Sequence, residues 1–296
     1  MQINCGIWVP KNTAAKAWRN KRFTDRDLLI LAILMQIIIP LSGSGQRFAN
    51  AGYTMPKPLI EVQGKRMIEY VVDLFPGEHD FIFICREDHL RQTSLEKVLM
   101  KKAPFGRIVS IAPHKLGPVH AVLQAEAMIR DNEPSVVNYC DFFMHWNYAH
   151  FKKTVLQSGC AGSIPCYTGF HPHLLKPGNV YAGCRTDEHL HLTEIREKHS
   201  FETDKTTGFH SAGTYYFKSG GLIKKYFHEL VNRNLSLNGE FYVSMVYQLM
   251  LEDALPVDVY DQLTHFCQWG TPEDLQEYLW WGEVFGKKIN PATNNW

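Results

Sequence analysis

Apolar residues in the first half of the chain fall into short runs and helically spaced segments that alternate. Residues 37–41 (IIIPL) and 80–85 (DFIFIC) are short, β-branched or aromatic runs, which is typical of buried strands. Residues 67–74 (MIEYVVDL) carry apolar side chains at helical spacing. The same patterns predict strands at 107–111 and 135–139 and helices at 89–99 and 119–129. Strands that alternate with helices predict a mostly parallel sheet covered on both faces.

The pattern changes after about residue 161, where strands follow one another with little helix between them. Thr271 caps a final predicted helix, which has Glu273 and Asp274 in its first turn. We therefore predict one α/β domain over residues 35–296, Rossmann-like, with a mixed sheet between helices and a C-terminal helical segment from about residue 271. The strands predicted in this half are 161–166, 180–185, 190–197, 212–217 and 258–266, and the helices are 219–231, 240–251 and 272–281.

Composition is ordinary for a globular protein and excludes several classes. The 296 residues are 45% hydrophobic and 21% charged, with a formal net charge of +1. A net charge this small gives no indication of a basic surface that would bind nucleic acid or an anionic membrane. The seven cysteines are odd in number, scattered and free of C-x-x-C pairs, so we expect reduced thiols in a cytoplasmic protein.

Residues 1–34 stand apart from the rest. A basic stretch precedes an apolar run over 28–41, which imitates a signal peptide, but the run is too short for a membrane span and leads into a glycine loop. We interpret 1–34 as an upstream extension, disordered or outside the native protein, with the domain beginning at Met35. A membrane-docking helix is the alternative.

The segment after the first predicted strand, LSGSGQRF over 41–48, has the chemistry of a phosphate-binding loop. Gly43 and Gly45 let backbone N–H groups approach phosphate oxygens, and Arg47 offers a planar fork to two oxygens. Lys57 follows as a compact cation between two prolines that hold its backbone extended. A dinucleotide fingerprint would need a third glycine where Phe48 stands, and no Gly-Lys-Ser/Thr closes a Walker loop.

These residues resemble the signature of the sugar-phosphate nucleotidyltransferases (nucleotide-sugar pyrophosphorylases), roughly G-x-G-x-R-hydrophobic followed by P-K-P-hydrophobic. The short loop is most similar to the capsule and polysaccharide branch. The resemblance implies a nucleotide-diphospho-sugar transferase fold of the GT-A-like kind. It also implies a nucleotide site formed by the loop and by Gly117, at the start of a helix. The loop residues it assigns to the nucleotide are Leu41, Ser42, Gly43, Ser44 and Gly45.

The resemblance assigns metal binding to Asp141, at the end of the strand predicted over 135–139. A carboxylate suits Mg²⁺, which keeps most of its waters. Gln268 stands where many members have a second metal-binding aspartate, and Glu240 is a candidate substitute. A glutamate that merely begins the helix over 240–251 is the equal alternative.

The acceptor half resembles the family's Y-G … E-x-x-E-K pattern. By that resemblance Glu197 holds acceptor hydroxyls, Lys198 holds the acceptor phosphate, and Gly183 belongs to the same acceptor site. The histidine pairs 171/173 and 189/191 lack a third metal ligand in the sequence, so we interpret them as polar surface or acceptor-site residues. The aromatic C-terminus, through Trp296, fits either a homo-oligomer contact or a core helix.

The reaction implied is transfer of an NMP group from an NTP to a phosphorylated acceptor, a sugar 1-phosphate first, with release of pyrophosphate. Arg47, Lys57, Asp141 and Lys198 are the predicted catalytic residues, and Mg²⁺ is the cofactor. A pyrimidine NTP is favoured, and a cytidylyltransferase for a non-sugar phosphorylated acceptor is an alternative. A non-catalytic nucleotide-sugar-binding relative and a glycosyltransferase of the same architecture are the others. We expect no nucleic-acid partner and no membrane span.

Overall fold

The structure is a computed structural model that describes residues 33–288. The extension predicted over 1–34 therefore lies outside the described residues except for its last two positions, and so does Trp296. None of the helices within residues 33–288 has the length and hydropathy that a membrane span requires.

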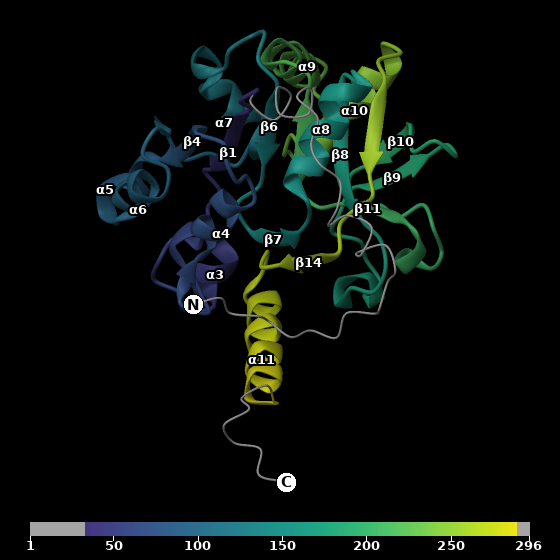
Figure 1. The fold of residues 1–296 in the computed structure, drawn as a ribbon. Helices are drawn as coiled ribbons and strands as arrows, with labels where there is room; N and C mark the ends of the chain where they lie inside the picture. The colour runs from purple at the N-terminus through teal and green to yellow at the C-terminus, as the bar shows by residue number, and fades with distance from the viewer. Residues whose placement is uncertain (1–32, 289–296) are drawn as a thin grey trace.

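Within the described residues ten strands form one twisted sheet, which confirms the fold class expected from the alternating pattern (Figure 1). The first half supplies four parallel neighbours in the order β6-β1-β4-β5. The second half adds antiparallel strands in the order β10-β9-β11-β8-β12, with β12 pairing to β6 and β13 pairing in parallel with β8. The strands are β1 Gln36–Leu41, β4 Asp80–Arg86, β5 Arg107–Ile111, β6 Ser135–Asn138, β8 Gly162–Tyr167, β9 Gly183–Thr186, β10 Leu192–Arg196, β11 Phe209–Ser211, β12 Thr214–Phe217 and β13 Val257–Tyr260.

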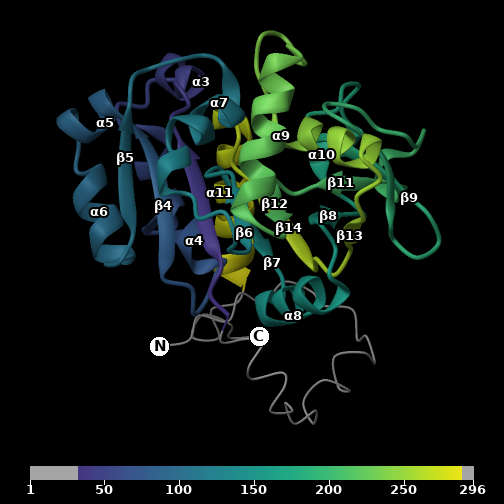
Figure 2. The same cartoon turned by 90° about the horizontal axis from the view of Figure 1, so that it is seen from above.

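Helices cover both faces of this sheet, as a continuous apolar central strand requires. On β1, Ile38 packs in the core beneath α7, α9 and α10, whereas Ile37 and Ile39 pack in the core beneath α4, α6 and α8. Viewed from above, α9 and α10 lie on one side of the sheet and α8 on the other (Figure 2). The helices are α3 Gln46–Asn50, α4 Met67–Asp73, α5 Glu87–Gln92, α6 Leu95–Lys102, α7 Gly117–Gln124, α8 Tyr148–Ser158, α9 Gly220–Asn232, α10 Val243–Glu252 and α11 Pro272–Lys288.

Two small sheets and a third core supplement the main sheet. In Figure 1, β7 and β14 lie below the main sheet, and α11 extends away from the body of the molecule. β7 (Phe142–His145) pairs with β14 (His265–Gln268), and β2 (Glu61–Val62) pairs with β3 (Lys65–Arg66). The third core contains Phe48, Trp269 and Leu275. It packs the loop after β1 against the segment that joins β14 to α11.

The single helix predicted over 89–99 is wrong, because the structure has two helices there, α5 and α6. Thr93 interrupts them with an extended backbone. Its hydroxyl donates to the carbonyl of His89 and accepts from the N–H of Leu95, so the side chain replaces helical backbone bonds on both sides.

The single strand predicted over 258–266 is also wrong. β13 ends at Tyr260 and β14 begins at His265, and the two belong to different sheets. The helix predicted over 119–129 begins two residues earlier and ends at Gln124, before a short 3-10 helix, η3 (Glu126–Met128). Helix α8 and strand β7 were not predicted.

Candidate active site

A cleft of about 470 Å³ opens beyond the carboxyl ends of β1 and β6, where ligands bind in open α/β sheets. It gathers residues from the loop after β1, from the segment around Lys57, from the start of α7, from the end of β6 and from the segment before α10. The lining residues are Pro40, Leu41, Ser42, Gly43, Ser44, Gly45, Gln46, Arg47, Phe48, Lys57, Pro58, His114, Lys115, Gly117, Pro118, Tyr139, Cys140, Asp141, Glu240, Tyr242 and Gly270.

The glycine loop forms one wall of this cleft. Leu41 is the buried end of β1, and Gly45 takes a left-handed conformation with φ of 62° as the chain turns into α3. Arg47 stands exposed on that short helix, while Phe48 faces inward and is 2% exposed. The inward phenylalanine anchors the turn in the third core, so the arginine that precedes it lines the cleft.

Lys57 is the junction of the site. Its Nζ donates to Asp141 Oδ2 at 2.7 Å and to the carbonyl of Gly270 at 2.9 Å. It also lies 5.2 Å from the centroid of the Phe48 ring. Two prolines and the 3-10 helix η2 (Lys57–Leu59) fix the backbone at this point. A single cation thus connects three parts of the chain that are distant in sequence.

Asp141 has the chemistry of a ligand for Mg²⁺. Its side chain is 35% exposed at the cleft, and only one of its two oxygens is engaged by Lys57. Within residues 33–288 no three His, Cys, Asp or Glu side chains cluster closely enough to hold a metal among themselves. Because Mg²⁺ takes one or two carboxylates and completes its shell with phosphate and water, one such carboxylate fits the ion.

The two candidates for a second metal position are placed differently. Glu240 lines the cleft together with Asp141, and its Oε2 accepts a hydrogen bond from Tyr242 at 2.7 Å. It precedes α10, which begins at Val243, so the interpretation of Glu240 as a helix-starting residue is wrong. Gln268 ends β14 outside the cleft lining, and its Oε1 is buried without a hydrogen-bond partner.

The three predicted acceptor residues lie beyond the cleft lining, and Tyr242 connects one of them to it. Lys198 Nζ donates to the Tyr242 hydroxyl at 2.8 Å and lies 4.7 Å from its ring centroid. Glu197 accepts from the Ser244 hydroxyl, and burial raises the pKa of its carboxyl. Gly183 packs so closely on the carbonyl of His199 that an added Cβ would lie 2.4 Å from it.

Gly117 has a structural reason beyond nucleotide contact. Its φ is +86°, and an added Cβ would lie 2.7 Å from the backbone N and O of Phe241. The N–H of Phe241 donates to the carbonyl of Leu116, and the N–H of Val119 donates to the carbonyl of Phe241. These bonds hold the start of α7 against the segment that carries Glu240 and Tyr242.

The cleft offers no activated thiol among its described residues. Burial, followed by the charge of Asp141, raises the pKa of Cys140 to about 12, so this cysteine is protonated at neutral pH. A protonated thiol is a poor nucleophile, so Cys140 does not have the chemistry of a catalytic cysteine.

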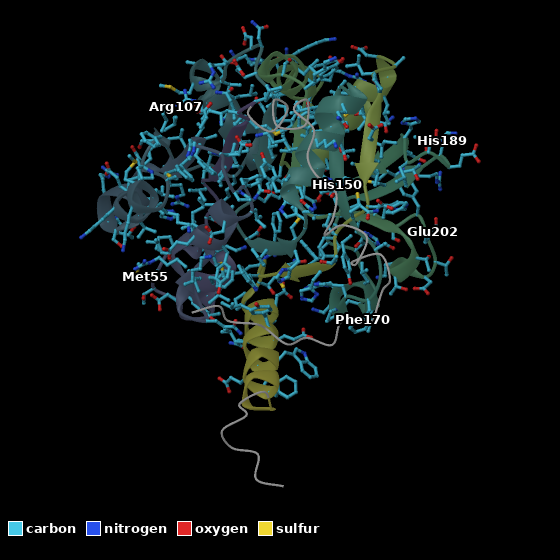
Figure 3. The ribbon with its side chains drawn as sticks, viewed as in Figure 1. Met55, Arg107, His150, Phe170, His189 and Glu202 are labelled. Carbon is cyan, nitrogen blue, oxygen red and sulfur yellow. The ribbon has the colours of Figure 1, made fainter. Side chains whose placement is uncertain are left out.

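His171 and His173 were interpreted as polar surface or acceptor-site residues, and the surface assignment is wrong for His173, which is 8% exposed. His173 lies in the 3-10 helix η4 (Pro172–Leu175), and its Nε2 contacts Asp274 Oδ1 in the first turn of α11. Burial raises the pKa of Asp274, but the interactions with His173, the hydrogen bond from Thr271 and the charge of Lys176 together outweigh this effect and hold the pKa below its usual value. The second pair is on the surface as predicted, and His189 points away from the molecule (Figure 3).

Sequence reasoning missed several residues of the cleft. Tyr139, His114, Lys115 and Tyr242 line it, and burial followed by the charge of His120 lowers the pKa of His114. None of them belongs to a motif. In this part of the chain the sequence pointed only to Glu240, although Tyr242, two residues later, makes the contact to Lys198.

One comparison with known proteins shows the family, and another shows the fold. Residues 36–254 match the family described as nucleotidyl transferase. The nucleoside-diphosphate-sugar pyrophosphorylase structure from Vibrio cholerae RC9 aligns with a TM-score of 0.66 at 17% identity, over 82% of this chain and 99% of that one. A putative glucose-1-phosphate thymidylyltransferase from Bacillus anthracis aligns with a TM-score of 0.63 at 15% identity, over 83% and 94%.

A third solved structure is the inositol-1-phosphate CTP transferase from T. maritima. It aligns with a TM-score of 0.63 at 16% identity, over 88% of this chain and 98% of that one. At these identities the likeness shows the fold alone. No curated protein sequence gives a significant match.

Proposed function

Because the chain belongs to the nucleotidyl transferase family, we propose that it transfers the NMP group of an NTP to a phosphorylated acceptor and releases pyrophosphate. The observation that carries this proposal is the junction at Lys57, where a cation meets the metal-type carboxylate of Asp141 in a cleft walled by the glycine loop. A bound triphosphate would have to contact the cation, the carboxylate and the glycine loop at once, and all three line the same cleft.

The reaction requires positioning and charge neutralisation. An oxygen of the acceptor phosphate attacks the α-phosphorus of the NTP, the bond from that phosphorus to its bridging oxygen breaks, and pyrophosphate leaves in line. In this assignment Lys57 stabilises charge that builds on the α-phosphate, and Arg47 neutralises the leaving pyrophosphate. Lys198 places the acceptor phosphate, with Tyr242 holding its ammonium group.

Asp141 would hold a Mg²⁺ ion in this reaction, and the ion would neutralise charge on the phosphates. We expect Asp141→Asn to raise the Mg²⁺ concentration for half-maximal pyrophosphate release by about tenfold, because the amide is a neutral ligand. The measurement is a Mg²⁺ titration of turnover. Asp131→Asn is the matched control, since Asp131 is an exposed partner of Lys224. An unchanged Mg²⁺ requirement in Asp141→Asn would contradict the assignment.

The acceptor is proposed to be a sugar 1-phosphate, in the synthesis of a polysaccharide or capsule precursor in the cytoplasm. The similarity of the short loop to the capsule branch supports this, as do the two neighbours whose names refer to sugar nucleotides. A second candidate keeps the reaction and changes the substrates, with CTP and a phosphorylated polyol. It is supported by the neighbour named as an inositol-1-phosphate CTP transferase.

The test is pyrophosphate release from each of the four common NTPs and dTTP, with Mg²⁺, against a panel of phosphorylated sugars and polyols. Release with one pair would identify the base and the acceptor together. Nucleotide binding without release from any pair would favour the non-catalytic relative, and turnover of a sugar nucleotide without pyrophosphate would favour the glycosyltransferase.

A further inference from the structure

The buried pair His173–Asp274 lies outside the cleft lining, yet it is connected to Lys57 through one peptide group. Asp274 and Thr271 cap α11 reciprocally, since the N–H of Asp274 donates to Thr271 Oγ1 at 3.3 Å and the N–H of Thr271 donates to Asp274 Oδ2 at 3.1 Å. The second oxygen of Asp274 is engaged by His173 Nε2. Both side chains are nearly inaccessible, with 8% and 3% exposed.

The N–H of Thr271 and the carbonyl of Gly270 belong to the same planar peptide unit. One end of this peptide is therefore held by Asp274, and the other end accepts the hydrogen bond from Lys57 Nζ at 2.9 Å. An ionised acceptor on the N–H side fixes the plane and adds to the dipole of the carbonyl that faces the ammonium group. The residue before it, Trp269, donates its N–H to the carbonyl of Asp141 at 2.9 Å.

We propose that His173 and Asp274 are positioning residues, which orient the peptide 270–271 so that its carbonyl holds the Lys57 ammonium group toward Asp141 and the cleft. The proposal rests on the proposed function for its catalytic consequence. It gives η4, which carries His173, a connection to Lys57 through the first turn of α11. Neither residue contacts the cleft itself.

The first experiment replaces His173 with leucine. We expect kcat to fall about tenfold while KM for the NTP changes little, because Lys57 loses orientation but keeps its charge. His173→Gln is expected to restore most of kcat, since the amide nitrogen can donate to Asp274 as Nε2 does. His191→Leu is the matched control, since it removes a surface imidazole that also pairs with an aspartate, Asp258, at 2.9 Å, and its kcat should equal that of the wild type.

The second experiment is a double-mutant cycle with Lys57→Ala. If His173 acts through Lys57, His173→Leu should cause no further loss of kcat in the Lys57→Ala background. Additive losses would overturn the proposal, as would wild-type kcat in a folded His173→Leu variant. Asp274→Asn covers the case in which His173→Leu does not fold, because its amide cannot accept from Thr271 and His173 at once. The same loss of kcat is expected.

A readout independent of turnover separates this inference from the proposed function. Brief acetylation with acetic anhydride, read by mass spectrometry, should label Lys57 severalfold faster in His173→Leu than in the wild type, while the exposed Lys97 is unchanged. If the wild type releases no pyrophosphate with any substrate pair, the proposed function fails and this labelling still decides the inference. Equal labelling of Lys57 in both proteins would overturn it.

Discussion

Replacing Lys57 with alanine is expected to lower kcat for pyrophosphate release by about a hundredfold or more and to leave the fold intact. The lysine is the described cation that joins Asp141 to the carbonyl of Gly270 at the cleft, with its side chain 15% exposed. Removing one preorganised charge that faces the reacting phosphates costs about 3 kcal/mol of transition-state stabilisation. Steady-state pyrophosphate release measures the loss, and thermal unfolding confirms the fold.

Lys65 provides a closely matched control for this substitution. Like Lys57, it pairs with an aspartate, Asp73, and lies near an aromatic ring, 4.2 Å from the centroid of Tyr70. It lies outside the cleft lining, so Lys65→Ala should keep wild-type kcat. Lys57→Arg should stay impaired, because a planar guanidinium does not replace a compact ammonium between two acceptors. Wild-type turnover in Lys57→Ala would remove Lys57 from the mechanism.

The parts of the site that could be predicted from sequence are those coded in short segments. A β-branched strand followed by glycines and Arg47, and a lysine between prolines, each have a local physical reason. The structure brings Arg47, Lys57, Asp141 and Gly117 to one cleft. What each does in catalysis remains a prediction from the resemblance.

The contacts that join these segments could not be predicted, because they are made between distant parts of the chain. Lys57 meets Asp141 and Gly270 across 84 and 213 residues. The two engaged groups differ in kind, since one is a side chain and the other is a backbone carbonyl. His173 was misinterpreted for the same reason. The local sequence around His173 is typical of a loop exposed to solvent. The burial of His173 comes from its contact with Asp274 of α11, which is 101 residues further along the chain.

Helix α8 was missed although the sequence carried its signals. Asn147 caps it by accepting from the N–H of His150, and Gly159 ends it in a left-handed conformation. Tyr148, Phe151 and Val155 supply an inward face at helical spacing. The break at Thr93 is the opposite case, because a threonine hydroxyl that bonds the backbone on both sides has no reliable sequence signal.

The largest expected effect on stability belongs to a carboxylate buried far from the cleft. Glu78 accepts hydrogen bonds from the N–H of Met35 at 2.8 Å, from the Tyr148 hydroxyl at 2.5 Å and from Lys152 Nζ at 2.6 Å. Its side chain is 0% exposed, and that of Lys152 is 5% exposed. The network fastens the start of β1 to α8, and the glycine loop follows β1 directly.

Lys152→Met is expected to lower the free energy of unfolding by about 3–5 kcal/mol, because it keeps most of the side-chain volume but leaves the buried Glu78 carboxylate without its cation. Urea unfolding at neutral pH measures the change. Lys224→Met, which removes the cation of an exposed pair with Asp131, should cost no more than about 1 kcal/mol. Adding Glu78→Gln to Lys152→Met removes the uncompensated charge and should recover part of the loss. A Lys152→Met protein as stable as the Lys224→Met control would mean that hydrogen bonds from Met35 and Tyr148 suffice for Glu78, and that the buried ion pair does not fasten β1.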